Sequence, residues 1–257
     1  MTKAGFVALI GRPNAGKSTL MNWLLGEKIA MVSQKANATR KRLNAIVMHK
    51  GDQIIFVDTP GLHQKEKLLN QFMLEEALKA IGDCDLVVYL APASDSIKHY
   101  KHFLELNRHK RKHIIVLSKI DTVKQSQLLS RISEYNQFSN EFEALIPFSV
   151  TKSVGRGDLL DTIVKYLDES PYLFDPEDLT TEMVRDIYRE FIREAIFENI
   201  SDEIPYSSSA IKRIGRDSRI KIEELIGKKV YLDLFVSVKP NWTSDKKMLD
   251  ELGYQPK

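Results

Sequence analysis

A run of glycine, lysine and hydroxyl residues near the amino end has the composition and spacing of a phosphate-binding loop. The stretch GRPNAGKST, residues 11–19, fits the pattern G-x-x-x-x-G-K-[ST] in full. Glycine lets the backbone turn tightly, and consecutive N–H groups at the start of a helix attract an anion. In this pattern the lysine places its charge on the outer phosphates and the serine hydroxyl faces Mg²⁺. The residues expected to bind a nucleotide here are Gly11, Asn14, Ala15, Gly16, Lys17, Ser18 and Thr19.

A carboxylate stands at the end of the apolar stretch IIFVDTPG, residues 54–61. In proteins with a phosphate loop, a strand that ends in aspartate carries the carboxylate directed at Mg²⁺, which indicates Asp58. Gly61 can bring its N–H to the γ-phosphate, because glycine lets the loop approach closely. The letters DTPG alone are compatible with an ordinary turn, but their place after a phosphate loop argues against it.

The stretch HIIVLSKID, residues 113–121, indicates which base is bound. A strand here delivers Lys119 and Asp121 to the same edge as the phosphate loop. A carboxylate there can accept the ring N–H and the exocyclic amine of guanine, and adenine offers neither in that geometry. The Lys119 stem can lie along the base plane. The pattern favours GTP and GDP; an ATPase is the alternative, and competition between GTP and ATP tests it.

These motifs need a scaffold, and the first two thirds of the chain alternates short β-branched runs with helical patterns. The predicted strands are residues 6–10, 43–49, 53–58, 86–90, 113–117 and 144–148, and the predicted helices are residues 68–81, 96–108 and 127–138. Several strands are apolar almost throughout, which is typical of a parallel sheet buried on both faces. Residues 43–49 and 53–58 predict a hairpin at the edge. The expected fold class is α/β: a P-loop NTPase domain with a mostly parallel sheet over residues 1–170.

A second, smaller domain follows. The proline- and acid-rich stretch ESPYLFDPEDLT starts at residue 169, and we place a linker at residues 171–180. Residues 181–200 and 213–227 have helical spacing of apolar side chains. Residues 228–240 alternate apolar and polar side chains, which predicts a half-buried strand. Residues 181–257 are therefore expected to form a small α+β domain.

Composition and charge set the limits of the interpretation. The chain has 257 residues, of which 43% are hydrophobic and 28% charged, as in globular proteins with one or two domains. The net charge is +3, and lysine and arginine exceed the acids after residue 210, which suits a polyanionic partner or a solvated surface. Cys84 is the single cysteine and fits a reducing compartment. We see no transmembrane segment or signal peptide and expect a cytoplasmic location.

The order of the three motifs is that of translation-factor-class GTPases, and the sequence resembles the Era family. The resemblance rests on GRPNAGKST, DTPGLH, the SKID string, the linker and the ending KKVYLDLFVSVKPNWTSDKKMLDELGY, so it covers nearly the whole chain. It implies a GTPase domain followed by a KH-type RNA-binding domain. It also implies binding to small-subunit (16S) ribosomal RNA near its 3′ end and a role in maturation of the 30S subunit. We expect a monomer, and peripheral association with the inner membrane stays open.

Three positions depart from the family pattern. Ser118 replaces the asparagine that ties the base-binding string to the phosphate loop, so we expect weaker nucleotide binding. Ser149 and Val150 stand where the family has Ser-Ala, and the Val150 N–H keeps its role as donor to the guanine oxygen. In the first mobile loop, residues 33–42, the paired threonines are reduced to Thr39. The resemblance implies that Thr39 contacts Mg²⁺ and the γ-phosphate, and a plain loop residue is the alternative. The metal set is then Ser18, Thr39 and Asp58.

Hydrolysis would be an in-line attack of water on the γ-phosphoryl group, helped by positioning and by neutralisation of charge. Leu62 follows Gly61 where many regulatory GTPases carry a glutamine that orients the water, so either another group positions the water or the rate is slow until a partner helps. Related GTPases with an asparagine at the place of Asn14 coordinate K⁺, which leads to the hypothesis of K⁺ stimulation. The alternative is that Asn14 only shapes the loop. The residues assigned to catalysis are Lys17, Thr39, Gly61 and Asn14.

The RNA clamp of KH domains, a GXXG loop between two helices, is absent where it belongs. Compared with a full KH module, about thirty to forty residues are missing between Ala210 and Ile211. Either a segment has been dropped from the sequence, which we favour because both flanks match the family, or the protein lacks the clamp. The cations that can still meet phosphates are Lys212, Arg213, Arg216 and Arg219. A solvated helix face is the alternative for these four.

A different class of function is also open: a GTPase switch whose basic C-terminal domain binds a protein or a membrane surface. Salt-dependent retention of RNA discriminates between the two. We further expect GTP to order residues 33–42 and 59–68 and thereby to shift the C-terminal domain.

Overall fold

The structure is a computed structural model that describes residues 1–33, 39–62, 68–199, 208–235, 237, 239–252 and 254. The two loops expected to respond to the nucleotide, residues 33–42 and 59–68, therefore lie partly outside the described residues. Thr39 and Gly61 are among the described ones.

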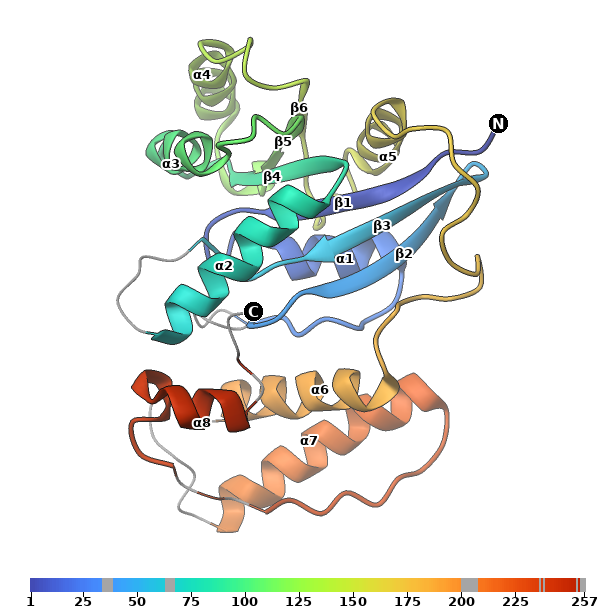
Figure 1. Cartoon of the computed structure of the whole chain (residues 1–257), viewed down its shortest axis with the longest axis vertical. Coiled ribbons are helices and arrows are strands. Elements are labelled where there is room, and N and C mark those ends of the chain that lie inside the picture. The colour runs from blue at the N-terminus through green and yellow to red at the C-terminus, as the bar shows by residue number, and fades with distance from the viewer. Residues whose placement is uncertain are drawn as a thin grey trace.

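Six strands form one sheet in the order β2-β3-β1-β4-β5-β6 (Figure 1). The strands are β1 (Ala4–Ile10), β2 (Leu43–His49), β3 (Asp52–Asp58), β4 (Leu86–Pro92), β5 (His113–Ser118) and β6 (Ala144–Pro147). All neighbours pair in parallel except β2 and β3, which form the predicted hairpin at one edge. All residues of β4 are buried, because helices cover both faces of the sheet. The predicted α/β class is confirmed.

Five helices cover the sheet: α1 (Lys17–Leu25), α2 (Leu68–Asp83), α3 (Lys98–Leu106), α4 (Gln125–Asn136) and α5 (Arg156–Lys165). Side chains of α1 and α5, such as Leu20 and Leu160, belong to one apolar cluster. Side chains of α2, α3 and α4, such as Ala77, Phe103 and Tyr135, belong to a second cluster. The helices thus form two layers with the sheet between them, and the core lies on both sides of β1 and β4.

The topology brings the three motifs to one edge of the sheet. The phosphate loop follows β1, the DTPG turn follows β3, and the SKID string begins at the end of β5. Strand β1 has β3 on one side and β4 on the other, so the strand order reverses at this point. Ligands of open parallel sheets bind at the carboxyl ends of the strands beside such a reversal.

The linker follows the sheet edge. The Gln53 side chain of β3 accepts the N–H groups of Leu173 and Phe174 at 2.8 and 3.1 Å. The Ile46 N–H of β2 donates to the Leu179 carbonyl at 2.9 Å. Residues 171–180 are therefore held in place by hydrogen bonds to β2 and β3.

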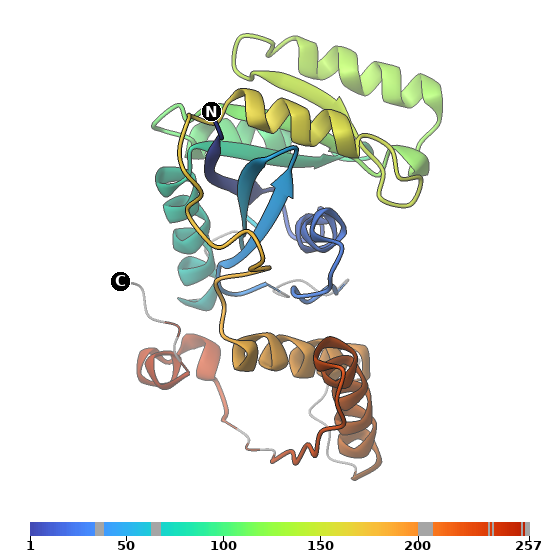
Figure 2. The ribbon, with the colours of Figure 1, turned by 90° about the vertical axis from the view of Figure 1, so that its right-hand side faces the viewer.

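A helical layer follows the linker, and Figures 1 and 2 show it below the sheet. It consists of α6 (Val184–Asn199), α7 (Ser208–Ile226), a 3₁₀ turn at Trp242–Ser244 and α8 (Lys246–Glu251). The helices predicted over residues 181–200 and 213–227 correspond to α6 and α7. Helix α7 passes through Ala210 and Ile211 without a break.

The strand predicted over residues 228–240 is wrong for the part that the structure describes. Residues 228–235 have no regular secondary structure. The alternation is nevertheless visible, because Val230 and Leu232 pack against the first apolar cluster whereas Tyr231 and Phe235 are 93% and 95% exposed. A strand needs a neighbour for its N–H and C=O groups, and the described residues after 180 offer none. The expected α+β domain is therefore helical in these residues.

Side chains near the end of the chain pack against the start of α2 and against Arg40 of the first loop. Leu69, Phe72 and Met73 at the start of α2 form a third apolar cluster with Leu249 of α8, and Trp242 and Tyr254 pack against it. From the other loop, the Arg40 guanidinium lies 5.1 Å from the ring of Trp242 and 5.8 Å from that of Tyr254. The C-terminal layer is thus in direct contact with the region that is expected to respond to the nucleotide.

Candidate functional site

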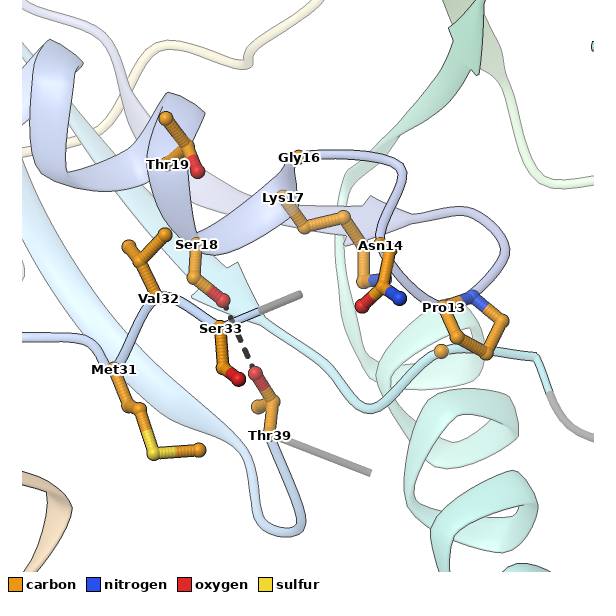
Figure 3. A pocket seen from close by; sticks show the side chains of 11 residues that line it. Pro13, Asn14, Gly16, Lys17, Ser18, Thr19, Met31, Val32, Ser33 and Thr39 are labelled. Carbon is orange, nitrogen blue, oxygen red and sulfur yellow. Dashed lines mark hydrogen bonds between the residues drawn. The ribbon is translucent and has the colours of Figure 1, made fainter. Parts of the chain in front are cut away.

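The phosphate loop leaves β1 and turns into α1 through two left-handed residues, Asn14 with φ 61° and Gly16 with φ 101°. Gly11 lies against β4, where an added Cβ would be 2.7 Å from the Leu90 carbonyl oxygen. Figure 3 shows the loop leading into α1, and because α1 begins at Lys17, the free N–H groups of its first turn face the loop. The loop has the geometry of an anion cradle.

Three oxygen-bearing side chains from separate motifs meet beside the loop. The Ser18 hydroxyl donates to Asp58 Oδ2 at 2.6 Å. Thr39 Oγ1 lies 3.0 Å from Ser18 Oγ (Figure 3) and 3.4 Å from the same Asp58 oxygen. The tertiary structure thus brings together the three residues that the sequence assigned to a metal.

Asp58 is fully buried, and its other oxygen, Oδ1, has no hydrogen-bond partner among the described residues. Burial raises the pKa of Asp58 to about 6, although the charge of Lys17 and the hydrogen bonds from Ser18 and Thr39 act in the opposite direction. A buried acceptor without a partner costs about 1–3 kcal/mol. Carboxylate and hydroxyl oxygens are the ligands that Mg²⁺ prefers, so this set of donors fits the ion.

The Lys17 side chain is buried at the same place. Its Nζ donates to the Arg12 carbonyl at 3.1 Å and to the Gly11 carbonyl at 3.4 Å. Burial lowers the pKa of Lys17 to about 8, and the nearby Asp58 charge opposes this shift. A phosphate group beside Nζ would favour the charged form further, because an opposite charge stabilises the ammonium.

The DTPG turn lies directly on the phosphate loop. The Leu62 N–H donates to the Gly11 carbonyl at 3.0 Å, and the Thr59 hydroxyl donates to the Leu9 carbonyl at 2.7 Å. A Cβ at Gly61 would lie 2.5 Å from the Pro13 nitrogen, so glycine is required for this contact. The side chain of Leu62 packs against the second apolar cluster.

The base-reading residues line a cavity of about 780 Å³ next to the loop. Asp121 Oδ1 accepts a hydrogen bond of 2.5 Å from the Ser149 hydroxyl, which is the main cause of a lowered pKa of Asp121. Lys119 Nζ donates to the Asn14 carbonyl at 3.1 Å. Ser118 Oγ is 3.4 Å from the Ala15 carbonyl oxygen, at the limit of a hydrogen bond. Val150 also lines the cavity.

Among the lining residues that sequence reasoning missed are Phe197 and Glu198 of α6. They belong to no motif and come from the C-terminal layer. On the same helix, buried Glu194 pairs with Lys28 at 2.8 Å and accepts the Val32 N–H at 3.4 Å. Helix α6 therefore lies against Lys28 and Val32, which precede residues 33–42.

A second omission is the pair Arg12–Asp95. The Arg12 guanidinium binds the Asp95 carboxylate through two nitrogens, and its Nη1 also donates to the Pro13 carbonyl at 2.9 Å. Asp95 follows β4 and is 8% exposed. The hydrogen bond to Asp95 is the main cause of a raised pKa of Arg12. The pair connects the phosphate loop to Asp95, which lies outside the motif. Because Asp95 is distant along the chain, no local sequence pattern indicates this contact.

The four cations expected to bind RNA are exposed on α7. Arg216 pairs with Asp217 at 3.1 Å, and Arg219 lies 3.8 Å from Glu223. No ion pair of Lys212 or Arg213 is present in the described part of the chain. The role of these four residues in RNA binding stays a prediction.

The class of protein follows from this arrangement. A mostly parallel sheet that carries a phosphate loop, a DTPG turn and an SKxD string at one edge is that of a P-loop GTPase. A family model described as "50S ribosome-binding GTPase" matches residues 6–119.

The nearly full-length relatives define the family. GTPase Era of Campylobacter lari is 45% identical over 288 aligned positions, covering 98% of this chain and 99% of that protein. GTPase Era of Helicobacter pylori (strain G27) is 45% identical over 294 positions, covering 98% and 97%. The chain therefore belongs to the Era family and is a GTPase.

Two solved structures of Era proteins are also similar to this chain over nearly their whole length. The chain is similar to a tyrosine-to-alanine variant of Aquifex aeolicus Era bound to GDP·AlF4⁻, with a TM-score of 0.90, 28% identity and coverage of 98% and 99%. It is also similar to Era in complex with MgGDPNP and nucleotides 1506–1542 of 16S ribosomal RNA. That match has a TM-score of 0.92, 27% identity and coverage of 99% of both chains.

The alignments also contain positions that this chain lacks. The match to the Campylobacter lari protein spans 288 positions, and 98% of 257 residues is about 252 residues of this chain. The difference, about 36 positions, has no counterpart here.

Within the described residues no helix is long and apolar enough to span a membrane.

Proposed function

We propose that this GTPase binds small-subunit ribosomal RNA near its 3′ end and assists maturation of the 30S subunit in the cytoplasm. The observation that carries the nucleotide part is the cluster of Ser18, Thr39 and buried Asp58 beside the phosphate loop. The RNA part is supported by membership of the Era family and by the likeness to an Era structure that holds 16S ribosomal RNA.

In this proposal Ser18, Thr39 and Asp58 hold Mg²⁺, which neutralises charge on the phosphate oxygens when it is bound. Guanine lies in the cavity of about 780 Å³, where Asp121 accepts its two N–H groups and the Val150 N–H donates to its oxygen. The bond from Ser149 lowers the pKa of Asp121, so the carboxylate stays ionised and able to accept. Lys119 lies along the base.

For hydrolysis, the Lys17 ammonium and the N–H groups of the loop stabilise charge on the γ-phosphoryl group. The Gly61 N–H contacts the same group, and so does Thr39. Leu62 offers no hydrogen bond to the attacking water, so we propose slow hydrolysis without a partner. The Asn14 carboxamide lies beside the phosphate cavity and is proposed to coordinate K⁺ (Figure 3). Equal turnover in K⁺ and in Na⁺ would contradict this role.

Contacts between the two layers support coupling of nucleotide to RNA. Glu194 accepts the Val32 N–H before the first loop, Arg40 lies over Trp242 and Tyr254, and the start of α2 packs on the same aromatic rings. A nucleotide that orders either loop would therefore change contacts of the C-terminal layer. Equal RNA affinity in the GTP-bound and GDP-bound protein would refute this coupling.

A second candidate rests on the exposed cations of α7. About 36 alignment positions have no counterpart in this chain, which fits both a segment dropped from the sequence and a chain that lacks the clamp. Without the clamp, RNA contacts fall to the exposed cations Lys212, Arg213, Arg216 and Arg219. The candidate is then a GTPase switch whose basic C-terminal layer binds a protein or a membrane surface.

One set of measurements tests both candidate functions. GTP turnover with Mg²⁺ is compared for the unchanged chain and for Asp58→Asn, which should lose about 100-fold or more in rate. GTP and ATP then compete for the site, and GTP should win. Filter binding of 16S ribosomal RNA at increasing salt tests the RNA part. Retention that falls with salt supports it, and absence of binding favours the second candidate.

A further inference from the structure

A row of five basic residues, Arg108 to Lys112, forms the turn between α3 and β5. The sequence is RHKRK, and all five residues are exposed. We propose that this basic turn is a second contact surface for RNA, on the GTPase domain and separate from the C-terminal layer. The proposal rests on the RNA-binding function proposed above.

The turn has a defined shape. Buried Asn107, which is 5% exposed, caps it with its side chain. Asn107 Nδ2 donates to the Arg111 carbonyl at 3.0 Å, and Asn107 Oδ1 accepts the Arg111 N–H at 3.0 Å. Lys110 adopts a left-handed φ of 48° at the tip. The cations are therefore displayed from a fixed backbone, which lowers the entropy cost of binding.

Acidic side chains do not neutralise the turn. Arg108, Lys110, Arg111 and Lys112 form no ion pair with any residue that the structure describes, whereas arginines of α6 pair with acids of the same helix. Two acids on the neighbouring elements have other partners: Asp83 pairs with Arg42 at 3.0 Å, and Asp85 accepts the Phe6 N–H at 2.8 Å. Four like charges within five residues repel one another, and a polyanion relieves that repulsion.

A cavity of about 180 Å³ opens at the turn, lined by Arg108, Lys110 and Arg111 together with Glu141 and buried His113. His113 adds no charge, because burial lowers its pKa. Its Nε2 lies 2.9 Å from Tyr100 Oη. Three cations against one carboxylate suit a phosphate group. Arg108 and His109 also have planar side chains that can stack on unpaired bases.

RNA is favoured over a membrane by the absence of an apolar anchor. Binding at a lipid surface needs apolar side chains beside the cations. Among the described residues, no large hydrophobic side chain between 98 and 112 is exposed.

The position separates the turn from the nucleotide. It precedes β5 and so lies at the amino ends of the parallel strands, whereas the phosphate loop follows the carboxyl end of β1. Figure 1 shows α3, which leads into the turn, toward the end of the molecule opposite α6 and α7. Removing these charges should leave GTP hydrolysis intact.

The test variant is Arg108→Gln, Lys110→Asn and Lys112→Gln in the full chain. Arg111 is retained because it also donates to the Gly82 carbonyl. The matched control, Lys50→Asn, Lys165→Gln and Arg185→Gln, removes the same charge from exposed positions elsewhere. Asparagine is used at positions 50 and 110 because it tolerates their left-handed φ. The probe is full-length 16S ribosomal RNA, and the measurements are binding as a function of salt, GTP turnover and thermal melting.

If each lost cation is one lost phosphate contact, the slope of log K against log salt decreases in size by about 2, and affinity at 0.1 M salt falls about 100-fold. The control should change affinity less than about 3-fold, and all three proteins should melt and hydrolyse GTP alike. Equal binding by the variant and the control would overturn the inference and leave the proposed function standing. So would a loss of affinity with an unchanged salt slope.

Absence of RNA binding by the unchanged chain would remove the proposed RNA function and this inference with it. A second arm uses vesicles of phosphatidylglycerol. A variant that loses vesicle binding but keeps RNA binding would assign the turn to a lipid surface and so overturn the inference.

Discussion

Replacing Ser118 with asparagine should tighten guanine-nucleotide binding. The string that reads the base is tied to the phosphate loop by two side chains. Lys119 Nζ donates to the Asn14 carbonyl at 3.1 Å, but Ser118 Oγ stands 3.4 Å from the Ala15 carbonyl oxygen. At that distance the hydroxyl contributes little, because hydrogen bonds of this kind are best below about 3.0 Å. An asparagine amide reaches further than the serine hydroxyl and can donate at normal length.

The magnitude follows from one neutral hydrogen bond. Such a bond contributes about 0.5–1.5 kcal/mol, which corresponds to about 2- to 13-fold in affinity. The larger side chain has room, since Ser118 lines the cavity of about 780 Å³. We expect the dissociation constant for GDP to fall about 5-fold, mainly through slower release.

The assay is release of a fluorescent GDP analogue, followed by stopped flow, with Ser118→Ala as the matched control. The alanine variant should weaken binding less than about 2-fold, because the bond that it removes is long. Thermal melting checks that both variants fold. A loss of about tenfold in the alanine variant would show that the hydroxyl already ties the loops together. No gain in the asparagine variant would show that this tie does not limit affinity. Either result refutes the reasoning.

Three further predictions concern residues around the site. Gly61→Ala should force the DTPG turn off the phosphate loop, because the added Cβ would lie 2.5 Å from the Pro13 nitrogen. Kinetics should show that GTP turnover falls about 100-fold, and equilibrium binding should show that GDP affinity changes little. Arg12→Ala and Asp95→Ala should show a coupling of about 1–2 kcal/mol in a double-mutant cycle of denaturant unfolding, and additive effects would mean that the pair does not brace the loop. The Cys84 thiol should resist alkylation in the native protein and react after unfolding, because it is buried and burial raises its pKa to about 12. Rapid modification of the folded protein in mildly alkaline buffer would contradict the position of Cys84 in the core.

Much of the candidate site was predictable from the sequence because its parts are contiguous. Residues 11–19 form their cradle locally, since the loop, the left-handed Gly16 and the first turn of α1 are neighbours along the chain. The apolar strands indicate a parallel sheet, and parallel strands bring their carboxyl ends to one edge. For this reason the sequence alone places the phosphate loop, Asp58 and Asp121 at one site.

Contacts between distant segments had no such signal. Asp95 reaches Arg12 from the loop after β4, and Phe197 of α6 lines the base cavity from another layer. Neither position lies in a motif, so only packing shows them. The cap of Asn107 on the basic turn is local, but the exposure of residues 108–112 depends on the packing of the whole chain.

The sequence by itself thus determined the chemistry of the nucleotide site, because a phosphate loop and a base-reading string carry their residue types in short, ordered stretches. The tertiary structure decided what surrounds them. Residues 228–235 have the alternation of a strand, yet a strand exists only where a neighbour pairs with its backbone, and the described residues after 180 contain no such strand. Likewise, the pKa of Asp58 rises because the fold buries it, and burial is a property of the whole packed chain.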